Sequence, residues 1–127
     1  MDQKIVFIDF DGVLRTLHAH LEQGLYGGTY AFDMKAVNLV RELCEEFSAK
    51  IVVISVDARS DLGREQFLIN SKALGLFNHL FPDSSDSFAS KGHTYTAAIK
   101  NWLNEHQVKA CDYIVINDEP DEDGDLS

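Results

Sequence analysis

The chain has 127 residues, of which 45% are hydrophobic and 25% charged, as is typical of one globular domain. Acidic residues outnumber basic residues by 21 to 11, and the net charge of −10 argues against a basic nucleic-acid-binding domain or a basic membrane-surface module. No apolar run approaches the roughly 20 residues that a membrane span needs. We therefore expect a single domain over residues 1–127, with residues 119–127 as a flexible acidic tail.

The N-terminus and the cysteines favour a cytoplasmic protein. Met1 to Lys4 lead directly into an apolar run, with neither a basic region nor a small-residue cleavage site, so we expect no signal peptide. Two cysteines, Cys44 and Cys111, are too few for a disulfide framework and lack the spacing of a zinc site. Both lie in apolar stretches, which predicts buried free thiols.

The first half of the chain predicts a strand, a hairpin and a helix. Residues 4–10 form a short apolar run that ends at Asp-Gly, as a buried strand does. Apolar and polar residues then alternate around Gln23-Gly24, which predicts a hairpin over residues 17–30. Asp33 is a suitable N-cap for a helix that runs to about Ser48. Its expected buried stripe is Val37, Val40, Cys44 and Phe47.

The second half alternates strands and helices. We predict a buried strand over 50–55, a less regular helix over 61–74 that ends at Gly75, and a short strand at 79–81. A clear amphipathic helix follows over 90–106, and a last buried strand over 112–117. The inner face of that helix is expected to hold Tyr95, Ala98, Ile99, Trp102 and Leu103.

This order predicts an α/β fold. Strands that are apolar on both faces and alternate with helices are typical of a mostly parallel sheet with right-handed crossovers. The expected architecture is a Rossmann-like three-layer sandwich. In such folds ligands bind at the carboxyl ends of the strands.

Polar residues suited to chemistry follow the expected strands. The first strand ends in Asp9-Phe10-Asp11-Gly12, the second in Ser55 and the last in Asp118-Glu119, while Lys91 opens the expected 90–106 helix. Clustered carboxylates raise one another's pKa unless a cation is present, and an oxygen-only cluster suits Mg²⁺. A carboxylate nucleophile beside a hydroxyl and a lysine suits phosphoryl transfer.

Three segments carry a family resemblance. Residues 5–14, IVFIDFDGVL, resemble the first motif of the haloacid dehalogenase-like (HAD) superfamily. Residues 52–59, VVISVDAR, and 113–119, YIVINDE, are similar to the small HAD domains of bacterial and phage RNA-repair-type proteins. There the second motif usually reads Ser-Ser-Ser-Trp-Arg; this chain keeps Ser55 and Arg59 but differs at the three positions between them.

The resemblance implies a Mg²⁺-dependent phosphatase with an aspartyl-phosphate intermediate. Asp9 would be the nucleophile and Asp11 the general acid and base. Asp9, Asp11 through its backbone carbonyl, and Asp118 would hold Mg²⁺. Ser55 and Lys91 would bind the transferring phosphoryl group. Whether Glu119, Asp121 or Glu122 assists metal binding through water stays open. The role of Arg59 also stays open: it either binds a second substrate phosphate or pairs with Asp57 or Asp61.

The spacing of the motifs leaves no room for a cap domain, because the 17–30 hairpin and one helix fill the stretch between Asp11 and Ser55. The hairpin matches the flap that follows the first motif in this superfamily. Capless members have open sites and often act on macromolecules. The expected partner is therefore a phosphorylated substrate, with small metabolites, phosphopeptides and nucleic-acid ends all open, and with the oligomeric state undetermined. His18 and His20 share a face of the hairpin with Glu22; plain surface or substrate contact is favoured there over a metal site.

Two other functions fit parts of the pattern. A receiver-like signalling domain also uses carboxylates, Ser or Thr, Lys and Mg²⁺ around a phospho-Asp, for which Asp57 is the candidate. The order of the motifs argues against it, because the lysine precedes a helix and the last strand ends in acids. A HAD-like fold without turnover, acting as an interaction module, is the third hypothesis.

Overall fold

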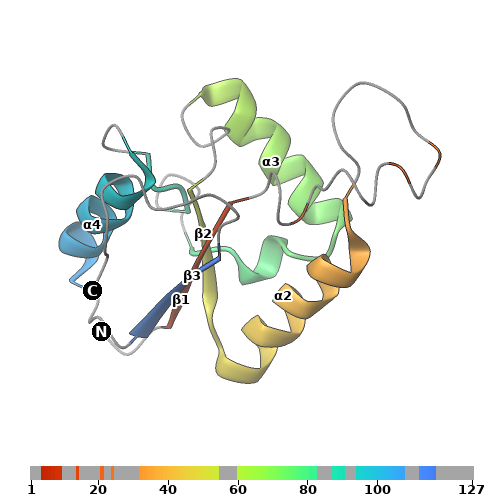
Figure 1. Ribbon diagram of the computed structural model, residues 1–127, viewed down its shortest axis with the longest axis horizontal. Coiled ribbons are helices and arrows are strands. Elements are labelled where there is room, and N and C mark those ends of the chain that lie inside the picture. The colour runs from red at the N-terminus through yellow and green to blue at the C-terminus, as the bar shows by residue number, and fades with distance from the viewer. Residues whose placement is uncertain are drawn as a thin grey trace.

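The structure is a computed structural model (Figure 1). The structure describes residues 4–9, 14, 21, 24, 32–54, 60–82, 87–90, 94–107 and 112–116. Three short strands form one sheet, and helices cover it from both sides.

Strand β1 (Ile5–Ile8) is the centre of the sheet. All four of its residues are buried, with exposed fractions of 2% or less. It pairs in parallel with β2 (Lys50–Val53) on one side and with β3 (Tyr113–Ile116) on the other, in the order β2-β1-β3. The register sets Ile8 beside both Val53 and Ile116, so the three strands end together. The predicted parallel α/β sheet is confirmed, and each predicted strand is shorter than expected.

A further segment borders β2, but it differs from the predicted strand at 79–81. Residues Phe77–His79 form a 3₁₀ helix, η2, and two isolated parallel bridges then join Leu80 to Ile51 and Phe88 to Val53. The amide of Phe81 donates to the Ile51 carbonyl at 3.0 Å, and the amide of Ala89 to the Val53 carbonyl at 2.8 Å. Because these contacts are single bridges, this segment covers the edge of β2 without forming a continuous strand.

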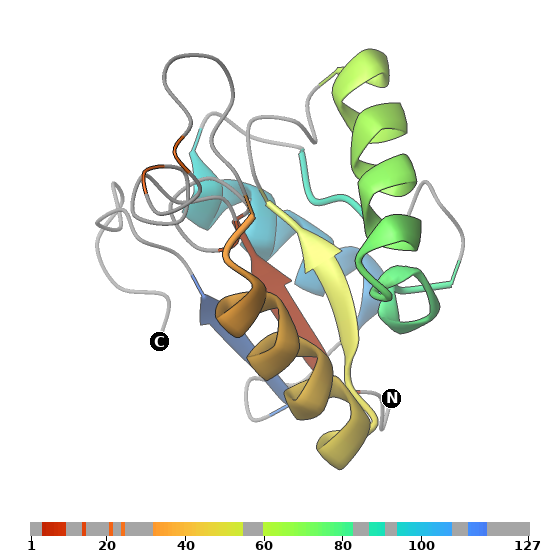
Figure 2. The ribbon, with the colours of Figure 1, turned by 90° about the vertical axis from the view of Figure 1, so that its right-hand side faces the viewer.

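Two helices, α2 (Met34–Phe47) and α3 (Asp61–Ala73), lie on one face of the sheet, as Figure 2 shows for α2 in front of the strands. Asp33 caps α2 as predicted, and its carboxylate accepts from the amides of Lys35 and Ala36. Val37, Val40 and Cys44 are buried as expected. Phe47 was predicted in the same stripe, but it is 50% exposed. Figure 2 shows that the last turn of α2 extends past the amino ends of the strands.

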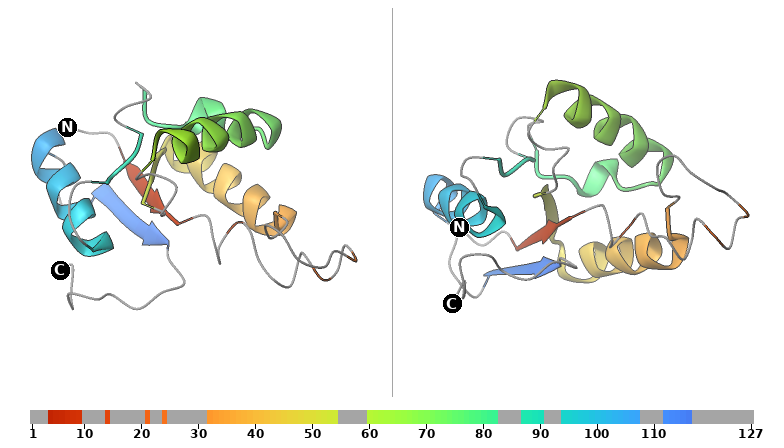
Figure 3. Two further views of the ribbon diagram at one scale, coloured as in Figure 1. Left: turned by 90° about the horizontal axis from the view of Figure 1, so that it is seen from above. Right: turned by 45° about the horizontal axis from the view of Figure 1, so that its top comes forward.

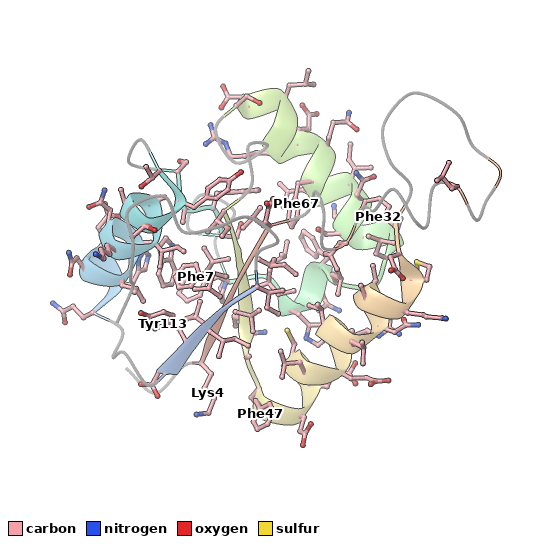
Figure 4. The ribbon with its side chains drawn as sticks, viewed as in Figure 1. Lys4, Phe7, Phe32, Phe47, Phe67 and Tyr113 are labelled. Atoms are coloured by element: carbon pink, nitrogen blue, oxygen red, sulfur yellow. The ribbon has the colours of Figure 1, made fainter. Side chains whose placement is uncertain are left out.

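Helix α4 (Tyr95–His106) covers the other face, so the predicted three-layer arrangement is confirmed (Figure 3). Its buried residues include Ala98, Ile99 and Trp102. The Trp102 ring meets the edge of Phe7 at 5.4 Å between centroids and stacks on His106 at 3.9 Å. Phe7 also lies 5.7 Å from Tyr113, and Figure 4 shows these two labelled rings on the α4 side.

The start of α4 corrects the prediction of a helix from residue 90. Ser90 is not helical, and α4 begins at Tyr95 with Thr94 as its N-cap. The Thr94 hydroxyl accepts from the amide of Ala97 at 3.1 Å, which satisfies a donor that the first helical turn leaves unpaired. Lys91 therefore precedes the helix.

The predicted hairpin over 17–30 lies outside the described residues except at two positions. Leu21 was expected in a strand, but it has a helical conformation, and the amide of Gly24 donates to its carbonyl at 3.0 Å. Gly24 has a φ of +72°, which a residue without a Cβ adopts readily and which closes the turn. The period-2 pattern was therefore misleading at Leu21, where a local turn determines the conformation.

Replacement of the α2 cap should lower stability. Asp33→Ala removes the acceptor for two amides at the start of α2, so we expect the free energy of unfolding to fall by about 1 kcal/mol. Urea unfolding followed by the fluorescence of Trp102, the one tryptophan of the chain, measures this. Glu46→Ala, at an exposed position of the same helix, is the control; an equal loss in both variants would contradict the role of the cap.

The thiol of Cys44 should be unreactive in the folded protein. Burial raises its pKa from 9.0 to about 11; Lys50 counteracts this in part and Glu45 adds to it. At pH 8 the thiolate population is then about a hundredfold smaller than that of an ordinary exposed thiol. In the Cys111→Ser background, a disulfide reagent should modify Cys44 slowly in buffer and rapidly in urea. Equal rates in the two conditions would show that Cys44 is accessible.

Candidate active site

Of the predicted site residues, the structure describes Asp9. The other predicted catalytic, phosphate-binding and metal-binding residues, Asp11, Ser55, Arg59, Lys91 and Asp118, lie outside the described residues. The same holds for His18, His20, Glu119, Asp121 and Glu122. The surroundings of Asp9 and the ends of the described segments therefore define the candidate site.

Asp9 lies where both ladders of the central strand end. Its amide donates to the carbonyl of Ile116 at 3.1 Å, so its backbone continues the pairing with β3. On the other side, the amide of Ile54 donates to the carbonyl of Ile8 at 3.0 Å. Asp9 is only 2% exposed. The backbone from which this carboxyl group extends is thus held by hydrogen bonds on both sides of its strand.

Burial of an acidic side chain is costly in an apolar interior, and it is retained where interactions with the carboxyl group offset that cost. The residues that precede Asp9 in β1 are all apolar, so Asp9 is the first polar group along this strand. Ionisable groups at such positions are concentrated at functional sites. Asp9 is therefore the strongest candidate for a chemical role among the described residues.

Side-chain alternation places Asp9 on the α4 side of the sheet. Ile5 and Phe7 pack against α4, whereas Val6 and Ile8 pack on the side of α2 and α3. Asp9 has the same parity as Phe7. Helix α4 runs antiparallel to the strands, so its amino end lies at the carboxyl edge of the sheet (Figures 2 and 3). The positive end of a helix dipole favours an anionic ligand at this edge.

The ends of the described segments lead into the predicted motifs. Ser55 directly follows Ile54, whose amide is bonded to Ile8, and Asp118 lies two residues after Ile116, whose carbonyl is bonded to Asp9. Lys91 lies two residues after Ala89, whose amide is bonded to Val53. Each motif therefore begins within two residues of a backbone group that is hydrogen-bonded at the carboxyl edge of the sheet.

Arg64 is a cation that the sequence interpretation missed. It lies in the first turn of α3, and its Nη2 is 2.7 Å from Oδ1 of Asp61. In the structure Asp61 pairs with Arg64, and whether it also pairs with Arg59 lies outside the described residues. The i, i+3 spacing on a helix could have identified this pair. Asp61 is fully exposed, so the pair contributes little to stability.

Among the residues that the structure describes, no group of three or more His, Cys, Asp or Glu side chains is placed to hold a metal ion. The predicted metal ligands are Asp9, Asp11 and Asp118, and the last two lie outside the described residues.

Cys44 is a buried free cysteine, as predicted. In the described part of the chain no helix is both long and apolar enough to cross a membrane.

The fold and the position of Asp9 define the class. A parallel α/β sandwich with an aspartate directly after its central strand, followed in sequence by a second aspartate, agrees with a HAD-like domain. Residues 5–127 match the family described as the HAD domain in Swiss Army Knife RNA repair proteins, and the chain belongs to this family. Searches of curated proteins and of solved structures gave no match.

Proposed function

We propose that this protein is a Mg²⁺-dependent phosphatase that removes a terminal phosphate from nucleic acid, with Asp9 as its nucleophile. The observation that carries the proposal is the buried Asp9 carboxyl group at the end of the central strand, bonded through its amide to Ile116. The family description, which names RNA repair proteins, favours a nucleic-acid end among the possible phosphoesters.

The proposed chemistry has two displacements at phosphorus. A carboxylate oxygen of Asp9 attacks the phosphorus, the bond to the ester oxygen breaks, and Asp11 gives its proton to the leaving alcohol. Asp11 then removes a proton from water, the water oxygen attacks the phosphorus, and the bond to Asp9 breaks. Inorganic phosphate leaves, and both carboxyl groups return to their starting states.

Positioning of the phosphoryl oxygens is assigned to Ser55 and Lys91. Phosphoryl transfer depends chiefly on orientation and on stabilisation of charge. The Ser55 hydroxyl would donate a hydrogen bond to the phosphoryl group, and the Lys91 ammonium would add positive charge to that of the amino end of α4. Arg59 directly precedes Ser60, the N-cap of α3, and is assigned to a second phosphate of the substrate.

The donor set fits Mg²⁺. The residues proposed to hold it are Asp9, Asp11 through its carbonyl oxygen, and Asp118, and hard oxygen donors are the ligands this ion prefers. The buried Asp9 carboxyl at the carboxyl edge supports this assignment. When bound, the ion neutralises charge on the carboxylates and on the phosphate. Whether Glu119, Asp121 or Glu122 assists is left to mutagenesis.

Charge bears on a nucleic-acid substrate in two ways. A net charge of −10 opposes binding of a polyanion, since affinity for phosphates rises with Lys and Arg contacts. Six of the acids lie between Asp118 and Asp125, however, and account for more than half of that net charge. The acidity is thus concentrated at the proposed metal site and in the adjoining segment.

Family membership favours this proposal over a receiver-like domain. A non-catalytic interaction module is the remaining alternative, and turnover distinguishes it. We also propose a cytoplasmic location, and the buried free thiol of Cys44 supports a reducing compartment.

Loss of the nucleophile should abolish turnover. Asp9→Asn keeps the size of the side chain but replaces the nucleophilic carboxylate with a neutral amide, so we expect phosphate release from a 3′-phosphorylated oligoribonucleotide to fall by about 10³-fold or more. Asp11→Asn should lose about 10²–10⁴-fold. A 5′-phosphorylated oligonucleotide and a generic aryl phosphate, assayed in parallel, test the substrate class.

The matched control is Asp112→Asn, which makes the same chemical change at the amino end of β3 and should keep full activity. Activity that survives in Asp9→Asn would contradict the proposed nucleophile. A wild-type protein that is inactive on all three substrates would favour the interaction module.

Magnesium should stabilise the fold through Asp9. A ligand that binds only the native state raises its stability, by about 2.7 kcal/mol at a hundred times the dissociation constant. We expect Mg²⁺ to raise the melting temperature of the wild type and of Asp112→Asn, excess chelator to reverse the shift, and Asp9→Asn to lose most of it. An equal shift in Asp9→Asn would place the ion elsewhere.

A further inference from the structure

Helix α3 places its amino end beyond the carboxyl edge of the sheet. After β2 ends at Val53, the chain passes through α3 and returns as the segment that meets β2 at Ile51 and again at Val53. Figure 2 shows α3 antiparallel to β2, with its first turn past the carboxyl ends of the strands. The first turn of α3 therefore lies at the same end of the sheet as Asp9.

Arg64 lies on the inward face of this helix. It precedes Phe67 by one helical turn and Ser71 by two, and these two residues are 2% and 0% exposed. The rings of Phe67 and Phe88 meet edge to face at 5.4 Å between centroids, and Phe88 is bridged to Val53, the last residue of β2. Arg64 lies about 4.5 Å further toward the amino end of α3 than Phe67. Because its side chain is 33% exposed, Arg64 is a half-buried cation just beyond the carboxyl end of β2.

The ion pair with Asp61 orients the guanidinium but gives little reason for an arginine on the inward face. Oδ1 of Asp61 lies 2.7 Å from Nη2 of Arg64, and Asp61 is the first residue of α3. The side chain of Arg64 thus extends toward the amino end of the helix, as helical side chains generally do. Asp61 is fully exposed, and an exposed ion pair adds little stability.

We propose that Arg64 binds a backbone phosphodiester of the nucleic-acid strand whose terminal phosphate is removed at Asp9. This inference rests on the proposed function. Side-chain alternation directs Asp9 to the α4 side of the sheet, whereas Arg64 faces the same edge from α3 on the other side. The terminal phosphate and a neighbouring phosphodiester are then held by opposite layers of the sandwich. A guanidinium suits this task, because its planar fork matches two phosphate oxygens.

The consequence is a preference for strand ends over mononucleotides. A nucleoside 3′-monophosphate offers the same terminal phosphate as a 3′-phosphorylated oligoribonucleotide but has no phosphodiester. Arg64 therefore adds affinity for the oligonucleotide alone. Its contact also offsets part of the repulsion between a polyanion and a chain with a net charge of −10.

The ratio of the kcat/KM values for these two substrates tests the role of Arg64. Arg64→Gln keeps much of the side chain but removes its charge, and it should lower the preference for the oligonucleotide by about tenfold, mainly through KM. Lys72→Gln, the same kind of change in the last turn of α3, is the matched control and should keep the preference of the wild type. An unchanged preference in Arg64→Gln would overturn the proposal.

Binding tests the proposal without turnover. Fluorescence anisotropy of a labelled 3′-phosphorylated oligoribonucleotide is measured with Mg²⁺ in the Asp11→Asn background, which slows hydrolysis. Arg64→Gln should raise Kd by about tenfold and reduce the salt dependence of log Kd by about 0.7, the contribution of one phosphate contact on a single strand. Asp61→Asn removes the ion pair but keeps the cation, so it should bind at least as tightly as the Asp11→Asn parent.

The outcomes separate this proposal from the proposed function. Equal losses of affinity in Arg64→Gln and Asp61→Asn would show that the ion pair is merely structural and would overturn the proposal, as would a parent that does not bind the oligonucleotide. A wild type without turnover whose binding depends on Arg64 would refute the phosphatase and support the contact. Trp102 fluorescence verifies that each variant folds.

Discussion

The structure depends on the double pairing of one four-residue strand. Strand β1 has a hydrogen-bonded neighbour on each side and packed helices on each face, so each of its residues is almost completely removed from water. Such a strand must be apolar throughout, and Ile5–Ile8 is. The first residue that departs from this rule is Asp9, which is still bonded to β3 and still buried. The pairing that forms the core thus also determines where the acidic group lies.

The two ends of the sheet differ in the charged groups that they carry. At the amino end, Lys4 precedes β1 and Lys50 is the first residue of β2, and the Lys50 ammonium donates to the carbonyl of Asn78. At the carboxyl end the chain turns from strand to loop at Asp9 and Ile54, and α4 presents its capped amino end. A phosphate is therefore favoured at the carboxyl end by the helix dipole, and under the proposed function the acids that follow β1 and β3 in the sequence would hold a cation there. The combination of both charges at one edge is characteristic of metal-assisted phosphoryl chemistry.

Much of this organisation could be predicted from the sequence, because apolar runs and capping residues report directly on burial and on helix ends. The three strands, the Asp33 cap and the buried positions of α2 and α4 follow from such local signals. Errors arose where tertiary contacts or local turns decide. Phe47 fits the helical stripe but lies beyond the sheet, the helix start at Tyr95 depends on Thr94, and Leu21 lies in a turn. Of the candidate site, sequence placed Asp9 correctly at the end of a buried strand; its bond to Ile116 needs the register of β3, which no pattern encodes.

Burial across the sheet also links the candidate site to strand β3. The border formed by Leu80 and Phe88 leaves β2 buried apart from Lys50, whereas β3 is half-buried, so the ladder that holds Asp9 from the β3 side is the less protected of the two. Local opening is easiest where few apolar contacts cover a strand. Because the amide of Asp9 is bonded to Ile116, any strand that covers β3 would also restrain the backbone of the proposed nucleophile. The pairing of β3 and the order of the backbone at Asp9 are therefore physically coupled. Among the four side chains of β3, only the Tyr113 hydroxyl could take part in the chemistry.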